Sequence, residues 1–335
     1  MNIRELAKLA GLSKSTVAYA LKSSPLVNKA TREHVQALAK EHGYTPSPVV
    51  NQFMHQIRTS QVRKRSSNLA YILHGKEAKL GKRQLHEKEI IEGAIEQAKR
   101  LGYAMEIIPW EAEKLTEQRL NSVIKARGIQ GILIGPASQT QAMLKLDWER
   151  VYALASGYTL KDPPLDRIAS DLFLSINTSI ERALSRNYRK VILAISESSD
   201  ARVGYRWSSA ALIQKELHGT KRVQLLTDNW NCPKTSTLDK LEASKGCAII
   251  GPHQVYSHLQ KIGLSSPADI GFIALDTCGT PQTISAIYQP HREMGAQAVN
   301  LIASRVERGQ YGLPELPIHI TQECGWHEGE TLPIR

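Results

Sequence analysis

The sequence predicts an all-α helix-turn-helix headpiece followed by a two-lobed α/β body with doubly wound parallel sheets. Residues 1 to 45 show helical apolar periodicity without a strand pattern, whereas from Leu69 onward short apolar runs alternate with longer amphipathic segments. Such alternation is typical of parallel sheets joined by right-handed helical crossovers. Residues 69 to 335 are many for a single sheet, so we expect two similar lobes that bind ligands at the carboxyl ends of their strands.

The first two helices of the headpiece flank a glycine. Within residues 3 to 22, small Ala7 allows the helices to cross closely, and Gly11 allows the left-handed backbone of the turn. Ser13 can cap the second helix through its hydroxyl. This arrangement is that of a helix-turn-helix.

A third helix follows and leads into a proline-containing break. The helix begins after Asn28, which can cap it, and ends at Gly43. Prolines then interrupt the chain at 46 and 48, residues 49 to 57 could form one more short helix, and residues 58 to 68 are polar. We therefore expect a headpiece at 1–46, a hinge helix and linker at 47–67, and a body at 68–335. Its first lobe would span about 68–166 plus 290–318, and its second about 167–289 plus 319–335.

The body alternates expected strands with expected helices. The strands are apolar runs between turn signals, namely Leu69–Leu73, Ala104–Ile108, Gly131–Ile134, Val191–Ile195, Val223–Leu226, Ala248–Ile250 and Ile270–Leu275. The helices are amphipathic segments, namely Glu87–Leu101, Leu172–Ser185, Tyr205–Leu217 and Arg292–Arg308. Elements in this order form sheets that are covered by helices on both faces.

Basic residues concentrate at the N-terminal end of the chain. The chain has 43 Lys and Arg against 32 Asp and Glu, and residues 1 to 67 hold eleven of the basic and three of the acidic residues, a net +8 of the total +11. A basic segment joined to a near-neutral body suggests a polyanionic partner, because neutralised phosphates release condensed counterions. From charge alone, the alternative is a solvated basic tail.

The sequence contains no constellation for catalysis, and it calls for neither a metal nor a cofactor. The four cysteines lie far apart without a CxxC pair, which indicates free thiols in a reducing cytoplasm. GxSxG and GxxxxGK[ST] motifs are absent, and His86-Glu87 is not followed by the second histidine of an HExxH site. No stretch approaches 18 apolar residues and no signal-peptide core follows Met1, so we expect neither membrane insertion nor export.

Several segments carry a resemblance to a known family. They are residues 3–17 (IRELAKLAGLSKSTV), 27–32 (VNKATR) and 42–46 (HGYTP), and in the body 127–134 (RGIQGILI), 268–276 (ADIGFIALD) and 289–295 (QPHREMG). Together they resemble the LacI/GalR (lactose-repressor and galactose-repressor) family of bacterial transcriptional regulators over nearly the whole chain. The resemblance implies a periplasmic-binding-protein-like body, a homodimer on a near-palindromic double-stranded DNA operator, and a small-molecule effector, such as a sugar, in the cleft.

The resemblance also assigns DNA contacts within the headpiece. Base edges in the major groove would be contacted by Lys14, Ser15 and Tyr19. Many relatives carry arginine at the position of Tyr19, so this side chain would stack on a sugar or pack on a thymine methyl group. Phosphates would be contacted by Ser13, Thr16, Asn28 and Thr31. Asn28 and Thr31 suit a helix start equally well, so capping is their alternative role.

Residues 49 to 54 resemble the hinge helix of the family, which lies in the minor groove. Phe53 would be the apolar wedge between base steps, with packing onto the lobes as its alternative. Val50 replaces a smaller residue, which would alter the pairing of two hinge helices.

The effector would lie in the cleft between the lobes. Asp276 matches the ligand-binding carboxylate of the family, Trp230 resembles an aromatic platform, and Arg202 is a candidate for a bidentate arginine. Core packing and surface charge are the alternatives for Trp230 and Arg202. His74, which follows the first strand, would open onto the cleft or serve a structural role. Gly251-Pro252-His253 stands where relatives often carry a polyol-binding Asn-Asp pair, which argues against an ordinary sugar.

These features predict a transcriptional regulator without enzymatic activity, acting as a repressor on the nucleoid. One alternative is a solute-binding transport protein, which would have no use for residues 1 to 57. The other is a constitutive DNA-binding regulator with a degenerate cleft, and its support is Gly251-Pro252-His253.

Overall fold

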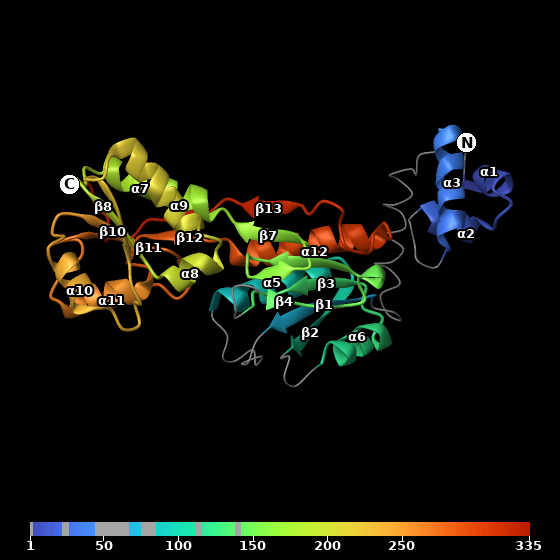
Figure 1. Cartoon of the computed structure of the whole chain (residues 1–335), viewed down its shortest axis with the longest axis horizontal. Helices are drawn as coiled ribbons and strands as arrows, with labels where there is room; N and C mark the ends of the chain where they lie inside the picture. The colour runs from blue at the N-terminus through green and yellow to red at the C-terminus, as the bar shows by residue number, and fades with distance from the viewer. Residues whose placement is uncertain (1–2, 22–26, 44–66, 75–84, 111–115, 138–141) are drawn as a thin grey trace.

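The protein consists of a small helical headpiece and a two-lobed α/β body (Figure 1). The computed structural model describes residues 3–21, 27–43, 67–74, 85–110, 116–137 and 142–335. The expectations for Val50 and Phe53 lie outside these residues, as does the hinge helix. None of the helices within the described ranges is long and apolar enough to cross a membrane.

The headpiece contains three helices, α1 (Ile3–Leu9), α2 (Lys14–Leu21) and α3 (Lys29–Glu41). Each contributes a small apolar face to one core, in which Leu6, Val17 and Val35 are fully buried. Gly11 adopts a φ of 63°, as the turn between α1 and α2 requires. The predicted helix-turn-helix is therefore confirmed.

The first lobe is built on a six-stranded parallel sheet. Its strand order is β13-β7-β5-β3-β1-β2. The strands are β1 (Ser67–His74), β2 (Tyr103–Trp110), β3 (Gly131–Ile134), β5 (Tyr152–Ser156), β7 (Asp166–Ser170) and β13 (His319–Gln322). Helices α5 (Leu85–Arg100) and α12 (His291–Glu307) contribute to the core on one face of the sheet, and α6 (Glu117–Ala126) contributes to the core on the other. A short pair, β4 (Ala142–Met143) with β6 (Leu160–Asp162), and a 3-10 turn at Trp148–Arg150 complete the described part of this lobe.

The second lobe repeats this design. Its sheet has the order β14-β12-β11-β10-β8-β9, and only β14 runs antiparallel to its neighbour. The strands are β8 (Val191–Ile195), β9 (Val223–Thr227), β10 (Ala248–Gly251), β11 (Gly271–Ala274), β12 (Ala286–Tyr288) and β14 (Gly325–His327). One face is covered by α7 (Leu172–Ser185) and α9 (Arg206–His218), and the other by α10 (Thr235–Glu242) and α11 (His253–Lys261), with the short α8 (Glu197–Arg202) after β8. Both sheets are thus doubly wound, as predicted.

The lobe boundaries differ from the predicted ones by one strand at the first and third crossings, whereas the second crossing lies where it was expected, near residues 289 and 290. We expected the first lobe to end near 166 and its return segment near 318, but β7 and β13 both belong to the first sheet, where they pair with each other. The chain therefore passes between the lobes after Ser170, between Tyr288 and His291, and between Gln322 and Gly325. Strand pairing across long sequence separations decides this boundary, and local apolar patterns do not reveal it.

Two glycines bring α5 and α12 into direct backbone contact. A Cβ on Gly93 would collide with the backbone carbonyl of Arg292, and a Cβ on Gly295 would collide with the carbonyl of Ile90. This crossing fixes the N-terminus of α12 at the boundary between the lobes.

Candidate functional site

Helix α2 presents its first residues to solvent. Val17 and Ala20 are buried, whereas Lys14 and Ser15 are exposed and the Tyr19 side chain is 46% exposed. Ser13 caps the helix, because its Oγ accepts a hydrogen bond from the Thr16 N–H at 3.1 Å. The three residues predicted to contact bases are therefore available on a helix that is anchored by its opposite face.

Helix α3 is capped by Asn28. The Asn28 Oδ1 accepts a hydrogen bond from the Thr31 N–H at 2.8 Å, which satisfies one of the free donors at the helix start. The capping role that the sequence left open for Asn28 is present, and the phosphate contacts of Ser13, Thr16, Asn28 and Thr31 stay predictions.

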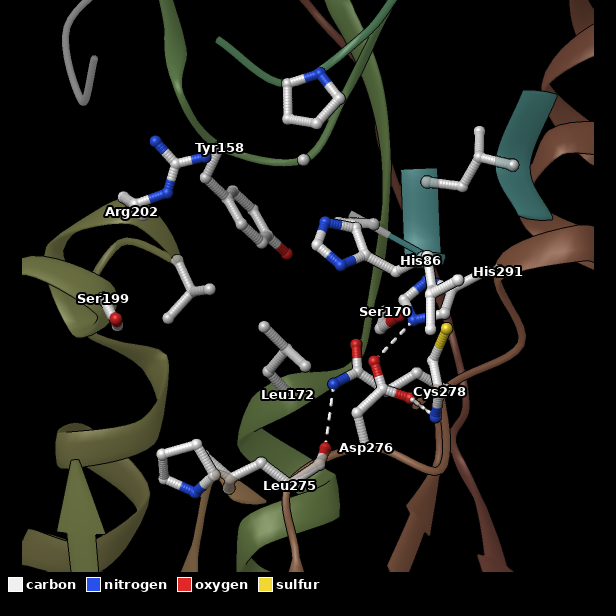
Figure 2. Close-up of a pocket in the computed structure, with 18 of the residues that line it drawn as sticks. His86, Tyr158, Ser170, Leu172, Ser199, Arg202, Leu275, Asp276, Cys278 and His291 are labelled. Atoms are coloured by element: carbon white, nitrogen blue, oxygen red, sulfur yellow. Dashed lines mark hydrogen bonds and ion pairs between the residues drawn. The ribbon is translucent and has the colours of Figure 1, made fainter. Parts of the chain in front are cut away.

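The body contains a pocket between its two lobes, with a cavity volume of about 620 Å³ (Figure 2). The first lobe lines it with His86 from α5, Tyr158 from the loop after β5, and Ser170 at the end of β7. The second lobe contributes Arg202 from α8 and Asp276 after β11. These positions lie at or after strand ends, where doubly wound sheets bind ligands.

Asp276 joins the two lobes at the inner side of this pocket. Its Oδ2 lies 2.7 Å from Nε2 of His291, the first residue of α12, and its Oδ1 accepts the backbone N–H of Cys278 at 3.0 Å. The His291 side chain is only 7% exposed, and its Nδ1 has no hydrogen-bond partner in the described structure. A ligand that donates a hydrogen bond to Asp276 must therefore share this carboxylate with the imidazole of His291.

The environment of the pocket keeps His86 neutral. Its ring centroid lies 5.5 Å from that of His291. Burial, reinforced by the charges of His291 and Arg202, lowers the pKa of His86 to about 4, although the charge of Asp276 acts in the opposite direction. At neutral pH this side chain offers one donor and one acceptor without charge.

The thiol of Cys278 is also held in its neutral form. Burial and the carboxylates of Glu89 and Asp276 raise the pKa of Cys278 to about 12. Its Sγ donates to Oε1 of Glu89 on α5 at 3.5 Å, which adds a second contact between the lobes. Cys278 therefore does not supply a nucleophile of low pKa.

Arg202 connects the two lobes at the outer side of the pocket. Arg202 Nη1 donates to the backbone carbonyl of Ala137, in the other lobe, at 2.9 Å. Burial lowers the pKa of Arg202, and the carboxylate of Glu87 partly compensates. Figure 2 shows the phenol of Tyr158 directed toward the centre of the pocket, between Arg202 and His86.

Two residues predicted for the effector site lie elsewhere. Trp230 is 4% exposed within the core beneath α10 and α11, and its backbone carbonyl lies 2.9 Å from Nε2 of His258. His74 ends β1 and packs edge-to-face on Trp110, with ring centroids 4.6 Å apart. Neither residue lines the pocket. Both placements are those of the alternatives, core packing for Trp230 and a structural role for His74.

The pocket contains residues that sequence reasoning did not assign to it. They include His86, Tyr158, Gln289 and His291. Gln289 and His291 belong to the QPHREMG segment that carried the family resemblance. That segment is the signal that could have placed both residues near the site. Nothing local in the sequence marks His86 or Tyr158. Within the described residues, no group of three or more His, Cys, Asp or Glu side chains is arranged to bind a metal ion.

Comparison with known proteins gives consistent results for the headpiece and for the whole chain. Residues 2–47 match the family model described as bacterial regulatory proteins, lacI family. The HTH-type transcriptional regulator TreR of Escherichia coli is 40% identical over 47 residues, which are 14% of this chain and 15% of that protein. The HTH-type transcriptional repressor PurR of Pasteurella multocida is 22% identical over 333 residues, which cover 91% of each chain.

The fold has solved counterparts of the same extent. The structure of the lac repressor dimer bound to operator and the anti-inducer ONPF superposes with a TM-score of 0.54 at 17% sequence identity, and it covers 99% of both chains. The likeness includes the headpiece and both lobes of the body. The headpiece thus matches the lacI family of bacterial regulatory proteins, and the whole chain is similar in sequence to PurR and in fold to the lac repressor.

Proposed function

We propose that the protein is a sequence-specific transcriptional regulator, a repressor without enzymatic activity, that binds its operator as a dimer and responds to a small molecule. The observation that carries this proposal is the combination of an exposed recognition helix with a pocket that is lined by both lobes. The lac repressor was solved as a dimer bound to operator and an anti-inducer. Its similar fold supports DNA binding by the headpiece and ligand binding by the body of this protein. We place the protein in the cytoplasm, on the nucleoid.

The DNA contacts follow from the headpiece. Lys14, Ser15 and Tyr19 project from α2 and would contact base edges, with Lys14 donating to guanine. Phosphates would be held by the residues around the two caps, namely Ser13, Thr16, Asn28 and Thr31. Because one headpiece contacts only a few base pairs, a two-fold dimer on a near-palindromic site supplies the remaining specificity.

The effector contacts follow from the pocket. Asp276 and Arg202 both line it and remain our assignments for ligand binding, while His86, Tyr158 and Gln289 add neutral polar groups. Gln289 Nε2 donates to the carbonyl of Leu275 at 2.9 Å, which orients its amide. A ligand can shift the protein between two states only by its differential affinity for them.

Selection of bound sequences from a random DNA pool tests this proposal. Purified full-length protein would be used at fixed, near-physiological salt, with a Lys14→Ala variant run in parallel. A near-palindromic motif that loses preference at one position per half-site in the variant supports a dimeric, sequence-specific regulator. Recovery of random sequences with affinities that depend only on salt would contradict it. A thermal-shift screen of small metabolites at the same salt would then test the pocket, because a ligand that binds only the folded state raises Tm.

A further inference from the structure

A second arginine, Arg206, contacts a residue of the other lobe that lines the pocket. The guanidinium carbon of Arg206, the first residue of α9, lies 3.6 Å from the ring centroid of Tyr158. Tyr158 belongs to the first lobe and Arg206 to the second. This contact therefore forms only while the two lobes are close together at this point.

The backbone before Arg206 is shaped to present its guanidinium. Gly204 and Tyr205 have φ angles of 65° and 59°, so the chain makes a left-handed turn between α8 and α9. Buried Asp200 fixes that turn, because its carbonyl accepts the Tyr205 N–H at 2.8 Å and its Oδ1 accepts the Ser208 N–H at 3.3 Å. The Arg206 Nη1 also donates to the carbonyl of Val203 at 3.2 Å. The guanidinium is thus anchored to its own turn.

Tyr158 is held equally firmly from the first lobe. Arg167 on β7 donates to the carbonyls of Gly157 and Leu160 at 2.6 and 3.0 Å, which fixes the loop on both sides of the tyrosine. The Tyr158 side chain is 7% exposed, and its hydroxyl points into the pocket (Figure 2). Burial raises the pKa of Tyr158, so the phenol remains protonated and able both to donate and to accept a hydrogen bond.

We propose that Arg206 is a positioning residue, which holds the Tyr158 ring in place across the cleft and stabilises the arrangement in which the two lobes are close together. The ring face is bound by the second lobe while the hydroxyl faces the pocket, so a ligand that contacts Tyr158 acts directly on one of the contacts that hold the lobes together. The attraction between a cation and a desolvated aromatic ring is strong enough to shift an equilibrium between open and closed arrangements of the lobes. This inference rests on the proposed effector role of the pocket.

Distance measurement between two spin labels tests the proposal without DNA or effector. One label would sit on the native exposed Cys232 of the second lobe, and the other on a Gln118→Cys substitution at an exposed position of α6 in the first lobe. Mass spectrometry would confirm two labels per chain, and dilution with unlabelled protein would remove distances between chains. We expect one short-distance population for the otherwise unchanged full-length protein.

The variants separate charge, ring and background effects. Arg206→Met should add a longer-distance population and raise the ratio of open to closed molecules roughly tenfold. Arg206→Lys should restore much of the short-distance population, and Tyr158→Phe should retain it because the ring stays under the cation. Arg222→Met, which removes an exposed arginine of the same lobe, should change nothing.

Either of two results would overturn the inference: an open distribution in the parent protein, or an unchanged distribution in Arg206→Met. If Arg206→Met fails to fold, Tyr158→Leu removes the other partner and must produce the same opening. A merely structural role of Arg206 would lower Tm without changing the distance. If the spin-label distances contradict the role of Arg206, the result of the DNA-selection experiment does not change. If no DNA motif is recovered, the spin-label distances do not change. The two proposals can therefore fail independently of each other.

Discussion

Asp276 shows how the surroundings of one carboxylate can alter the chemistry of a pocket. Its two oxygens already accept hydrogen bonds from His291 and from the backbone of Cys278. A carboxylate can accept about four hydrogen bonds, so capacity remains for a ligand, but the donors must approach alongside an imidazole. A ligand with several closely spaced hydroxyls fits this arrangement less well than one with a single donor at that position.

His86 gives the body a dependence of stability on pH. Its pKa is about 4 in the folded protein, against about 6.5 for an unperturbed histidine, so the unfolded chain binds the extra proton first. Stability should therefore be fully present above pH 6.5 and fall as the pH drops toward 4. Between pH 7 and 5, the contribution of this residue to the free energy of unfolding should fall by about 2 kcal/mol.

Denaturant unfolding of the full chain at both pH values measures this effect. His86→Gln should be less sensitive to pH than the parent protein, and His218→Gln, which removes a histidine far from the pocket, serves as the control. Equal pH sensitivity of His86→Gln and the parent would show that His86 is not held neutral.

Lys14 should determine base preference, because it projects from the start of α2 while the opposite face of the helix is buried. Replacement by alanine should relax preference at one position per half-site by about 1 to 3 kcal/mol. Competition binding with singly substituted operators gives that number. Lys40→Ala, at the exposed end of α3, is the matched control. A uniform loss across all sequences would instead make Lys14 a phosphate contact.

Among the helices, α5 and α12 depend on glycine for their packing. In an exposed helix, replacement of Gly by Ala stabilises by up to about 1 kcal/mol, whereas at Gly295 the new methyl group would meet the carbonyl of Ile90. Gly295→Ala should therefore lower the free energy of unfolding by roughly 1 to 3 kcal/mol. Gln297→Ala, on the exposed side of the same helix, should be nearly neutral. Denaturant titration of both variants decides the question, and a stabilised Gly295→Ala would refute the close crossing.

The cap of α3 permits a test that separates folding from DNA binding. Asn28→Asp retains the oxygen that caps the Thr31 N–H, so the thermal stability of the headpiece should be preserved or slightly increased. The added negative charge should weaken DNA binding if Asn28 lies beside a phosphate. Melting curves and operator affinity, measured together, provide both readouts. Asn28→Ala should instead lose about 1 kcal/mol of stability.

The elements show which features the sequence determines locally. Gly131–Ile134, Leu172–Ser185 and Val191–Ile195 were predicted with their observed bounds, because each is an apolar or amphipathic run between turn signals. Strands β5 and β7 were missed, although all their residues are buried, because short apolar runs without strong flanking signals resemble other buried segments.

The site was less predictable than the elements for the same reason. Asp276 and Arg202 were located through the family resemblance and do line the pocket. Trp230 does not line the pocket, because the chain turns after β9 and the indole enters the core. His86 and Tyr158 enter the pocket only through the pairing of distant strands, which no local pattern encodes.

For the molecule as a whole, the uneven charge predicts a steep salt dependence. Residues 1 to 67 carry a net +8, which a dimer would present twice to the DNA. If about six to ten of these basic residues contact phosphates, counted over both headpieces, raising salt from 50 to 200 mM should weaken binding by roughly 10³- to 10⁵-fold. Fluorescence anisotropy on the selected operator measures this slope. A nearly flat slope would show that the basic residues do not face the phosphates.

The interleaving of the two lobes also sets an order of events during protein synthesis. The headpiece core uses only residues between Leu6 and Ala39, so it can form as soon as that short segment has left the ribosome. The first lobe, by contrast, needs α12 in its core and β13 at the edge of its sheet, and both come from the last 45 residues of the chain. While the ribosome completes them, the apolar face of the first sheet that α12 covers stays open, and this nascent chain is the form of the protein most in need of a chaperone.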